Sequence, residues 1–566
     1  MKLGKNKQLI FCLIITVILG IVYFYFTLPA INLQSTDFYF YLITLIVIFF
    51  IVQTIVRMKN LRFKKVISED GQTTYVRDDG DDEYSNVEND PYFFRKKMSE
   101  RKGLIYIAAA IFGIIVIGSF FSSPVFFAGE YTRLINIEPG NFSEDITEIS
   151  YDQIPWLDKA SAERLGNRKL GELADMVSQF EVAPDYTQIN YKNRPVRVTP
   201  LLYGDVFKWF NNQKNGIPGY ITIDMVTQEG DVVRLKEGMK YSKSEYFFRN
   251  IDRYIRFHYP TYMFEQPVFE IDDDGNPYWI CPRIVKRISI FGGTDIEGIV
   301  MVNAVTGEHQ YYAKDEIPQW VDHVYRAPLL IQQYDYYGRY QSGFLNSIFG
   351  QRNVTMTTDG YNYLALNDDV YMYTGITSVV GNDESNIGFI LVNQRTKEAT
   401  YYQIAGAHEY SAMGSAEGAF QAYDYTATFP LLLNIHGQPT YFMALKDYSN
   451  LVKQYAMVNV KSYNIVATGA TVAECEENYT RMLSNNPDVD LPLNEDKISG
   501  TVDDIRVAIS DGNAVYYIKL REASTYYAID IKKNENVVLV NVGDKIEIAY
   551  LKTDAKIERA TSFDWI

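Results

Sequence analysis

The stretch at residues 104–127 reads LIYIAAAIFGIIVIGSFFSSPVFF and contains no charged side chain. Arg101 and Lys102 stand just before it, and Glu130 comes shortly after it. A run of about 20 apolar residues has the length to cross a bilayer as one helix. Because residues 128–566 contain no comparable run, this stretch predicts the last membrane span. It separates a membrane region from a long polar region.

Two earlier apolar runs, at 8–28 and 38–56, predict a pair of transmembrane helices within residues 1–57. The first run resembles a secretory signal peptide only superficially. It is too long, and no small-residue cleavage site comes after it. The sequence therefore predicts three N-terminal spans, with the lipid bilayer as an obligatory partner.

Basic residues are concentrated at both ends of the loop at 58–103, which joins the second span to the third. They are Arg57, Lys59, Arg62, Lys64 and Lys65 at its start and Arg95, Lys96, Lys97, Arg101 and Lys102 at its end. Basic residues close to span ends stay in the cytoplasm. We therefore expect a multi-pass membrane protein with a cytoplasmic N-terminus and an extracytoplasmic C-terminal region. The acidic run at 78–90 is interpreted as a solvated, flexible segment rather than a docking segment.

Charge is distributed unevenly along the chain, which carries a net charge of −16. Residues 1–127 contain 14 Lys and Arg against 11 Asp and Glu, a net charge of +3. The remaining residues therefore carry 40 basic against 59 acidic side chains, a net charge of −19. A region this acidic repels a phosphate backbone, so we expect no nucleic-acid partner.

The segment at 128–195 is predicted to be a helical linker. Apolar residues recur near a helical period between 158 and 180, which indicates an amphipathic helix there. These residues are Ala162, Leu165, Leu170, Leu173, Met176, Val177 and Phe180.

Internal similarity marks the segment at 196–486. GIVMVNAVTGEHQYY (298–312) and GFILVNQRTKEATYY (388–402) are identical at seven of fifteen positions. The matched pairs are Gly298/Gly388, Val302/Val392, Asn303/Asn393, Thr306/Thr396, Glu308/Glu398, Tyr311/Tyr401 and Tyr312/Tyr402. AMVNVKSYNIVATG (456–469) is a weaker third copy, and a hairpin pattern precedes each copy. These patterns predict three tandem antiparallel α+β units that share a continuous core.

Two Ser/Thr-x-x-Glu sequences predict helices that lie across these sheets. Ser242 and Glu245 form one capping box, after which Phe247, Ile251, Tyr254 and Ile255 share a helical face. Thr471 and Glu474 form another, which opens a helix that continues to about Asn485. Helices against small antiparallel sheets form an α+β layer.

The string G-x-V-x-V-N-A-x-T-G-E at 298–308 resembles the hairpin of PepSY-type domains, which are small extracytoplasmic α+β modules associated with inhibition or sensing at the envelope. As a whole, the chain resembles a group of uncharacterised bacterial membrane proteins with three N-terminal spans and a large outer domain. These resemblances imply an architecture, and they imply no catalytic residues.

Residues 497–566 contain five strand-like segments separated by turns, and their spacing is similar to that of an OB-type barrel. The segment carries 10 basic and 11 acidic side chains, so it lacks the basic groove of a nucleic-acid-binding barrel. It is interpreted as a barrel that closes the chain or docks a protein. The polar, proline-containing segment at 485–496 is predicted to be its linker.

The common catalytic motifs are absent from the sequence. It contains no phosphate-binding loop, no dinucleotide-binding glycine string, no H-E-x-x-H and no G-x-S-x-G. Ser99 and Lys102 match an S-x-x-K spelling by chance, because the accompanying motifs are missing. The histidines lack metal-ligand spacing; they are His258, His309, His323, His408 and His436.

A few residues allow a chemical interpretation beside a structural one. Glu270, Asp272, Asp274 and Gly275 match the start of a calcium loop, but Cys281 occupies its twelfth position, so a polar hairpin turn is preferred.

The remaining candidates are a possible disulfide and two pairs of titratable residues. Cys281 and Cys475 are expected to be buried free thiols rather than a disulfide. The pairs Asp368-Asp369 and His408-Glu409 would form an acid/base site only if the fold brought them together.

The sequence predicts a membrane-anchored envelope protein that binds or scaffolds partners, either other envelope proteins or wall polymer. It predicts no catalytic, cofactor-binding or metal-binding residue and leaves the oligomeric state open. Two alternatives remain, a carboxylate hydrolase that acts on the wall and a sensor that couples the outside to the loop at 58–103.

Overall fold

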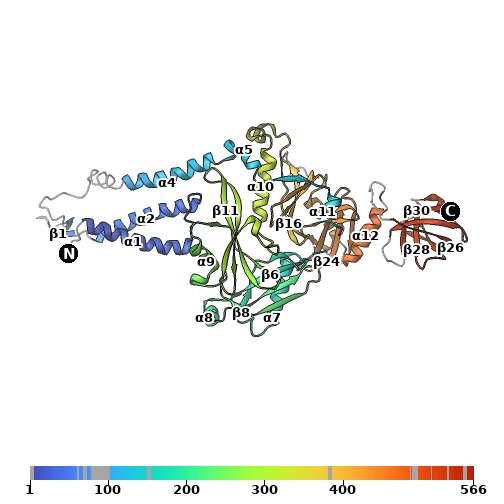
Figure 1. Ribbon diagram of the computed structural model, residues 1–566, viewed down its shortest axis with the longest axis horizontal. Helices are drawn as coiled ribbons and strands as arrows, with labels where there is room; N and C mark the ends of the chain where they lie inside the picture. The colour runs from blue at the N-terminus through green and yellow to red at the C-terminus, as the bar shows by residue number, and fades with distance from the viewer. Residues whose placement is uncertain are drawn as a thin grey trace. The chain divides into compact units, whose positions relative to one another are not determined.

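The computed structural model describes residues 5–59, 63–67, 73–77, 102–148, 154–379, 385–484, 486, 495–510, 513–531, 534–551 and 557–566. The chain forms two compact units. Unit 1 comprises Met1–Gly140 and Pro155–His408, and unit 2 comprises Asn141–Ile154 and Glu409–Ile566. Figure 1 labels the helices and strands of both units.

Three long apolar helices begin the chain: α1 (Lys5–Thr27), α2 (Thr36–Lys59) and α4 (Lys102–Phe121). Each contains a segment of 20 or 21 residues that is long and apolar enough to cross a membrane. α2 contacts both α1 and α4, and Figure 1 shows the three helices side by side. This confirms the prediction of three N-terminal helices with the length and composition of membrane spans.

The third span is shorter than predicted, because α4 ends at Phe121 and does not continue to Phe127. A separate helix, α5 (Pro124–Thr132), begins with Pro124. Proline disfavours helical backbone at the preceding residue, and Ser123 is extended, with φ −81° and ψ 160°. The proline therefore breaks the apolar run into two helices.

The loop between α2 and α4 contains an antiparallel pair that the sequence analysis did not predict, β1 (Phe63–Ile67) and β2 (Thr73–Arg77). The acidic run at 78–90 and Ser99 lie outside the described residues, as does most of the predicted linker at 485–496.

The prediction of a helical linker at 128–195 is wrong in two respects. The helix predicted at 158–180 is only α7 (Lys159–Gly171), and strands occupy most of the chain between residues 180 and 195. Asp158 caps α7 by accepting a hydrogen bond from the backbone N–H of Ser161. After Gly171 the chain forms turns, through which Met176 still reaches the core.

Four sheets share one strand order, although the sequence analysis found only three copies. Each sheet contains one long strand. Along one edge, this strand pairs with two shorter strands that precede it in the sequence, and the second of them is its hairpin partner. Along its other edge it pairs with the first of two further antiparallel strands. We number these helix-and-sheet units repeats 1 to 4; repeats 1 to 3 belong to unit 1 and repeat 4 to unit 2.

Repeat 1 consists of α7, β4 (Phe180–Val182), β5 (Thr187–Tyr191), β6 (Arg194–Tyr203), α8 (Val206–Asn212), β7 (Ile217–Asp224) and β8 (Gly230–Met239). Repeat 2 consists of η2 (Phe247–Arg249), α9 (Ile251–His258), β9 (Met263–Phe264), β10 (Val268–Ile271), β11 (Pro277–Ile288), β12 (Gly292–Asn303), β13 (His309–Ala313) and η3 (Lys314–Glu316).

Repeat 3 consists of α10 (Ala327–Tyr340), η4 (Asn346–Gly350), β14 (Thr355–Thr357), β15 (Asn362–Leu366), β16 (Asp369–Ser378), β18 (Gly388–Asn393) and β19 (Ala399–Tyr402). β3 (Ile137–Pro139) extends its sheet by pairing parallel to β19, and β17 (Ser385–Asn386) pairs separately with β20 (Gly406–Ala407).

Repeat 4 consists of α11 (Glu409–Gly418), η5 (Gln421–Tyr423), β21 (Thr426–Ala427), β22 (Leu431–Ile435), β23 (Gln438–Lys446), β24 (Val452–Asn459), β25 (Val466–Gly469) and α12 (Val472–Ser484). Unit 2 also contains α6 (Phe142–Asp145). Directly after this helix, the carbonyl of Ile146 accepts a hydrogen bond from the side chain of Asn434 in β22 at 2.6 Å.

The sheet of repeat 2 has both faces buried. Trp279 and Cys281 of β11 belong to the core shared with repeat 1, whereas Ile280 between them belongs to the core shared with repeat 3. Alternate side chains of a strand point to opposite faces. Two cores therefore require the nearly continuous apolar runs that these strands contain.

A shared turn explains the repeated Asn-x-x-Thr sequence. The side-chain oxygen of Asn303 accepts hydrogen bonds from the backbone N–H groups of Val305 and Thr306, both at 2.9 Å. Asn393 forms the same contacts in repeat 3. Asp224 forms them in repeat 1, where DMVTQEG takes the place of NAVTGEH. The exchange of Asp for Asn, together with Val232 and Val233 in place of the two tyrosines, makes this first copy hard to see in the sequence.

The repeated Gly and Tyr residues pack on one another across neighbouring strands. A Cβ atom on Gly298 would lie 2.3 Å from the carbonyl oxygen of Tyr312 and 2.7 Å from the hydroxyl of Tyr311. Gly388 has the same relation to Tyr402 and Tyr401. These glycines leave room for a tyrosine ring that covers the strand.

We expect Gly298→Ala to lower the free energy of unfolding by about 1–3 kcal/mol, because the new methyl group meets backbone that must shift. Gly129→Ala in α5, where no atom lies within 4 Å of the added Cβ, is the matched control. It should leave stability unchanged or raise it by up to about 1 kcal/mol. Urea unfolding of the detergent-solubilised chain measures both, and an unaffected Gly298 variant would contradict the close packing.

One predicted capping box does not begin a helix. Ser242 accepts a hydrogen bond from the N–H of Glu245, but α9 begins only at Ile251 and is capped by Asn250. The carboxylate of Glu245 instead binds Tyr203 and Trp209. The box at Thr471 precedes α12 as predicted.

The C-terminal strands pair in a ring. They are β26 (Glu495–Ser510), β27 (Asn513–Leu520), β28 (Tyr526–Asp530), β29 (Lys545–Leu551) and β30 (Ile557–Trp565). β26 pairs with β27 and β29, β27 with β28, and β30 with both β28 and β29, so the pairing returns to its first strand. A short helix, η6 (Glu535–Leu539), places Val537 in the core of this ring.

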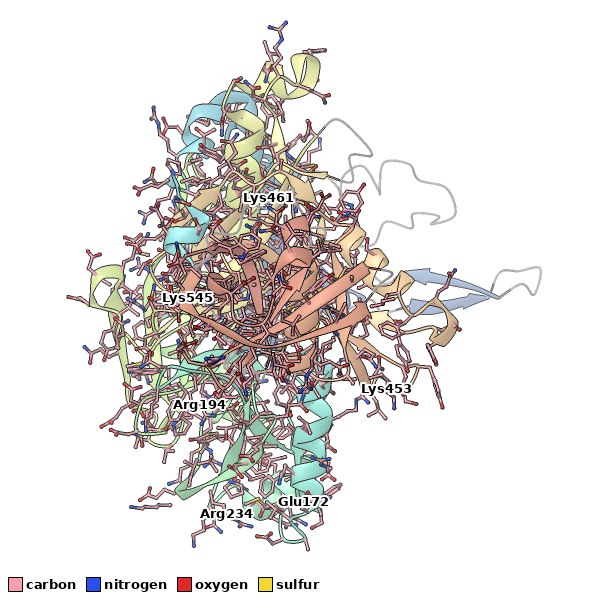
Figure 2. All side chains as sticks on the ribbon, turned by 90° about the vertical axis from the view of Figure 1, so that its right-hand side faces the viewer. Glu172, Arg194, Arg234, Lys453, Lys461 and Lys545 are labelled. Atoms are coloured by element: carbon pink, nitrogen blue, oxygen red, sulfur yellow. The ribbon has the colours of Figure 1, made fainter. Side chains whose placement is uncertain are left out.

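Ion pairs on the outer edge of repeat 1 are exposed. Arg234 of β8 lies 2.8 Å from Asp175, and Lys169 of α7 lies 3.4 Å from Glu172. Figure 2 shows Arg234 and Glu172 on the same edge of the molecule. Exposed pairs of this kind add little stability, so the repeats depend on their cores.

Candidate functional site: a buried carboxyl cluster between three hairpins

Hairpins β5–β6, β10–β11 and β15–β16 of the first three repeats meet in unit 1. We call this place the hairpin junction. Gln188 of β5 donates a hydrogen bond to the carbonyl of Tyr363 in β15 at 3.5 Å. Tyr220 of β7 donates to the carbonyl of Gly275, in the β10–β11 turn, at 2.8 Å. Each repeat therefore contributes backbone or side chains to one cluster.

Glu270 of β10 lies at the centre of the junction and is fully buried. Its two carboxylate oxygens accept hydrogen bonds from the backbone N–H groups of Asp322 and His323, both at 2.9 Å. Burial raises the pKa of Glu270 to about 7, and the two N–H donors offset only part of this effect.

Asp322 is buried beside Glu270. One of its oxygens accepts a hydrogen bond from the N–H of Asn190 at 2.7 Å, and the other has no hydrogen-bond partner among the described residues. Burial raises the pKa of Asp322, and the neighbouring carboxyls of Glu270 and Asp369 raise it further. Two adjacent buried carboxyls cannot both be charged without cost, so we infer that the pair retains a proton near neutral pH.

His323 is held neutral by its surroundings. Burial lowers its pKa to about 4, and the charges of Arg326 and Arg197 add to this effect. Its Nε2 atom lies within hydrogen-bond distance of the carbonyl of Gln188, so the neutral ring donates its proton there. His323 therefore links repeat 1 to the segment that comes after repeat 2.

Asp369 was considered as an acid/base residue, but it forms a structural ion pair. Its two oxygens bind the guanidinium of Arg395 at 2.6 and 2.7 Å, and Asn393 donates to it at 2.9 Å. Asp368 lies in the adjacent turn, with φ +64°, and burial followed by the charge of Asp273 raises its pKa.

The other sequence-flagged residues occupy structural positions. His408 comes directly after β20, and Glu409 begins α11 and is buried. Cys281 and Cys475 are free and buried, as predicted. Asp272 accepts hydrogen bonds from the N–H groups of Asp274 and Asn276, which confirms the hairpin turn.

Two histidines that lie far apart in the sequence have rings in contact, tilted by 59°. The rings of His258 and His309 have centroids 4.5 Å apart, and the Nδ1 atom of His309 lies 2.9 Å from the Tyr259 hydroxyl. Burial and the neighbouring His258 lower the pKa of His309. Among the described residues, no group of three or more His, Cys, Asp or Glu side chains is placed to hold a metal ion.

A second polar cluster joins the apolar helices to repeat 2. The Nε atom of Arg256 in α9 donates to the carbonyl of Leu28 at 2.9 Å, and its Nη1 atom reaches the carbonyls of Tyr259, Pro260 and Tyr262. Gln34, between α1 and α2, exchanges hydrogen bonds with the backbone of Lys286. A cation at a helix C-terminus is favourable, so Arg256 fastens the end of α1 to the repeats.

Sequence analysis flagged Glu270 for a different reason and missed its partners Asp322 and His323. The available signal was a polar Asp-His pair between two apolar residues, Val321 and Val324. Buried polar residues are hydrogen-bonded, but their partners here lie 52 to 135 positions away.

The pH dependence of stability tests the assigned state of Glu270. Its pKa is 4.5 ordinarily and about 7 in the fold, so the folded state holds more protons between these values. This contribution is present below pH 4.5 and is lost as the pH rises towards 7. His323 has the opposite effect between pH 4 and 6.5. Because its pKa is lowered in the fold, the folded state binds fewer protons there, and stability rises with pH.

The unchanged protein should lose the contribution of Glu270 as the pH rises, whereas the Glu270→Gln variant should not. We therefore expect the difference in unfolding free energy between the two proteins to shift by roughly 2 kcal/mol in favour of the variant from about pH 5 to pH 8. Urea unfolding of both proteins at matched pH values measures this difference, which cancels the contribution of His323. A pH-independent difference would show that Glu270 titrates normally.

Comparisons with known proteins assign no family. No family model matches the chain, and no curated protein matches it. Among solved structures, a chimera of apocarotenoid oxygenase and RPE65 matches with 7% identity and a TM-score of 0.13, over 70% of this chain and 67% of that one. Two Synechocystis apocarotenoid oxygenase mutants match with 8% identity and TM-scores of 0.13, over 71% of this chain and 67% of theirs. At this TM-score the likeness carries no argument about fold or function.

Proposed function

We propose that this protein is a membrane-anchored scaffold of the bacterial cell envelope. In this proposal the three spans hold the repeats outside the cell, where they bind other envelope proteins or wall polymer without catalysing a reaction. The main supporting observation is the attachment of repeat 2 to the ends of the spans. Arg256 binds the carbonyl of Leu28, and the N–H of Ile31 donates to the carbonyl of Pro260 at 2.8 Å. In this proposal, these contacts hold repeat 2 at a constant height above the bilayer.

The state of the carboxyls favours a scaffold over the wall hydrolase. A glycosidase needs two carboxyls that reach the scissile bond from a solvent-accessible site. Glu270 and Asp322 are buried, and Asp369 is neutralised by Arg395. The observed clustering of carboxyls therefore supports a structural role.

The C-terminal ring and the repeats fit the same proposal. Five strands in which β28 pairs parallel to β30 support the interpretation of an OB-like barrel. The tandem sheets support the PepSY-like interpretation, in which each module presents an outer edge to a partner.

Photo-crosslinking in living cells tests the scaffold. A photoreactive amino acid at Phe349 or Tyr448, which are 82% and 97% exposed, should produce discrete adducts with envelope proteins or wall polymer. The same amino acid at Trp279, which is 2% exposed, should crosslink only within the chain. Equal patterns at exposed and buried sites, or shortened glycan chains after incubation with the purified protein, would contradict the proposal.

Orientation is tested with an impermeant thiol reagent on whole cells. The three native cysteines are buried, so they give a low background. Asn141→Cys should react, because Asn141 is exposed and lies beyond the third span, whereas Ser85→Cys in the loop at 58–103 should not. The reverse pattern would place the repeats in the cytoplasm.

A further inference from the structure

Five phenylalanines on the surface of repeats 1 and 2 are exposed. We call them the aromatic rim: Phe207, Phe210, Phe247, Phe248 and Phe257, with exposed fractions of 76, 69, 61, 62 and 43%. Single exposed apolar side chains are ordinary, whereas a contiguous group marks an interaction surface.

Helix α8 points its apolar residues outward. Phe207 and Phe210 are three positions apart and share a face. Trp209 is buried on the opposite side, where its indole N–H donates to Glu245 at 2.8 Å. The inward face of α8 is therefore packed and hydrogen-bonded within the fold. The phenylalanines on its outward face are available to a surface outside the chain.

The backbone at Phe247 is strained, with φ +54°. A bulky residue rarely adopts this conformation, which persists only where the surrounding structure holds it in place. The strained residue brings Phe247 to the surface beside Trp209, with ring centroids 5.8 Å apart. It thereby joins the phenylalanines of α8 to Phe248 of η2 and Phe257 of α9.

The aromatic rim is continuous with the outer end of the first span. The ring of Phe248 lies 6.1 Å from that of Tyr25, and the ring of Phe257 lies 6.0 Å from that of Phe24. The guanidinium of Arg253 lies 4.6 Å above the ring of Tyr25. Figure 1 shows α8 and α9 at the end of the repeats nearest to the apolar helices.

The length of α1 places this contact at the membrane boundary. Its apolar segment, Lys7–Thr27, has 21 residues, which corresponds to about 31 Å of helix and matches a hydrocarbon core of about 30 Å. Tyr25 and Phe26 therefore lie where aromatic side chains collect, between the acyl chains and the headgroups. Phe248 and Phe257 contact Tyr25 and so lie at this depth. Phe247, next to Phe248 in the chain, continues the rim to α8 through its contact with Trp209.

Acidic side chains around the rim are neutralised. Glu245 is buried and pairs with Arg249 at 3.2 Å. Asp205 caps α8 and pairs with Lys208 at 3.5 Å. A third acidic side chain, the exposed Asp252 of α9, has the positive charges of Lys243 and Arg253 close to it. Arg253, beside Tyr25, is also placed to attract a phosphate headgroup.

We propose that the aromatic rim rests in the interfacial layer of the lipid bilayer, against phospholipid headgroups and the first acyl carbons. It is a second membrane contact, separate from the three spans. The spans anchor the chain, and the rim prevents repeats 1 and 2 from tilting away from the surface.

Lipid-dependent quenching of a fluorophore tests this contact in the full chain. Phe207→Cys and Phe247→Cys, each labelled with an environment-sensitive dye, are reconstituted into vesicles of phosphatidylethanolamine and phosphatidylglycerol. The vesicles contain, or lack, lipid brominated near the headgroup. Thr227→Cys is the matched control, because the β7–β8 turn is exposed and lies roughly 25 Å along the sheet from α8.

Loss of most of the dye emission at positions 207 and 247 in brominated vesicles, with unchanged emission at 227, is the expected result. Equal insensitivity at all three positions would overturn the proposal. Emission that depends on protein density and not on bromination would assign the rim to a second copy of the chain and would also overturn it. Phe248→Cys replaces Phe247→Cys if the strained position does not tolerate the change.

Discussion

Replacement of Glu270 by alanine is expected to lower the free energy of unfolding of unit 1 by about 3–5 kcal/mol. The substitution leaves the buried N–H groups of Asp322 and His323 without an acceptor. It also opens a cavity among three repeats. Urea unfolding of the detergent-solubilised chain, monitored through tryptophan fluorescence, measures the loss.

A local measurement distinguishes this mechanism from general damage. Amide hydrogen exchange at Asp322 and His323 should accelerate in the Glu270→Ala variant more than exchange in repeat 4. Asp274→Ala is the matched control, because it removes an exposed carboxylate from the same hairpin and should change stability by less than about 0.5 kcal/mol. Equal effects of the two substitutions would show that the buried hydrogen bonds contribute little.

Replacement of Arg256 by alanine is expected to cost about 3 kcal/mol and to loosen the attachment of repeat 2 to α1. The guanidinium donates to four carbonyl groups, including that of Leu28 at the end of α1. Burial lowers the pKa of Arg256 to about 10, so the side chain remains charged at neutral pH. Its removal takes away the donor to the carbonyls of Leu28 and Tyr262, whereas those of Tyr259 and Pro260 keep the N–H groups of Tyr262 and Ile31.

The amide of Ile31 reports this attachment directly, because it donates to the carbonyl of Pro260. Its hydrogen exchange should accelerate in the Arg256→Ala variant. Arg194→Ala is the control. The exposed Arg194, labelled in Figure 2, pairs with the partly buried Asp224 at 2.6 Å and should contribute less than about 1 kcal/mol. Unchanged exchange at Ile31 would show that other contacts hold the span in place.

Local patterns were sufficient wherever the physical cause is local. A charge-free run predicts a span. Pro124, which begins α5 shortly after α4 ends at Phe121, is also visible in the sequence, but the predicted span continued through it. Asn-x-x-Thr predicts its turn because the side chain of Asn303 binds the next backbone N–H groups. Repeat 1 was missed because Asp224 performs the same task with a different side chain.

The sequence by itself determined the three apolar helices, the antiparallel α+β character and the free, buried cysteines. Periodicity, turn chemistry and the sparseness of cysteine act over a few residues. Only the tertiary structure decided which polar residues meet: Glu270 with Asp322, Asp369 with Arg395, and Arg256 with Leu28. It also decided that Phe207 and Phe247 face outward, near the end of α1. Such contacts depend on how distant strands pack, because a side chain's burial and charge state are set by neighbours that the local sequence does not contain.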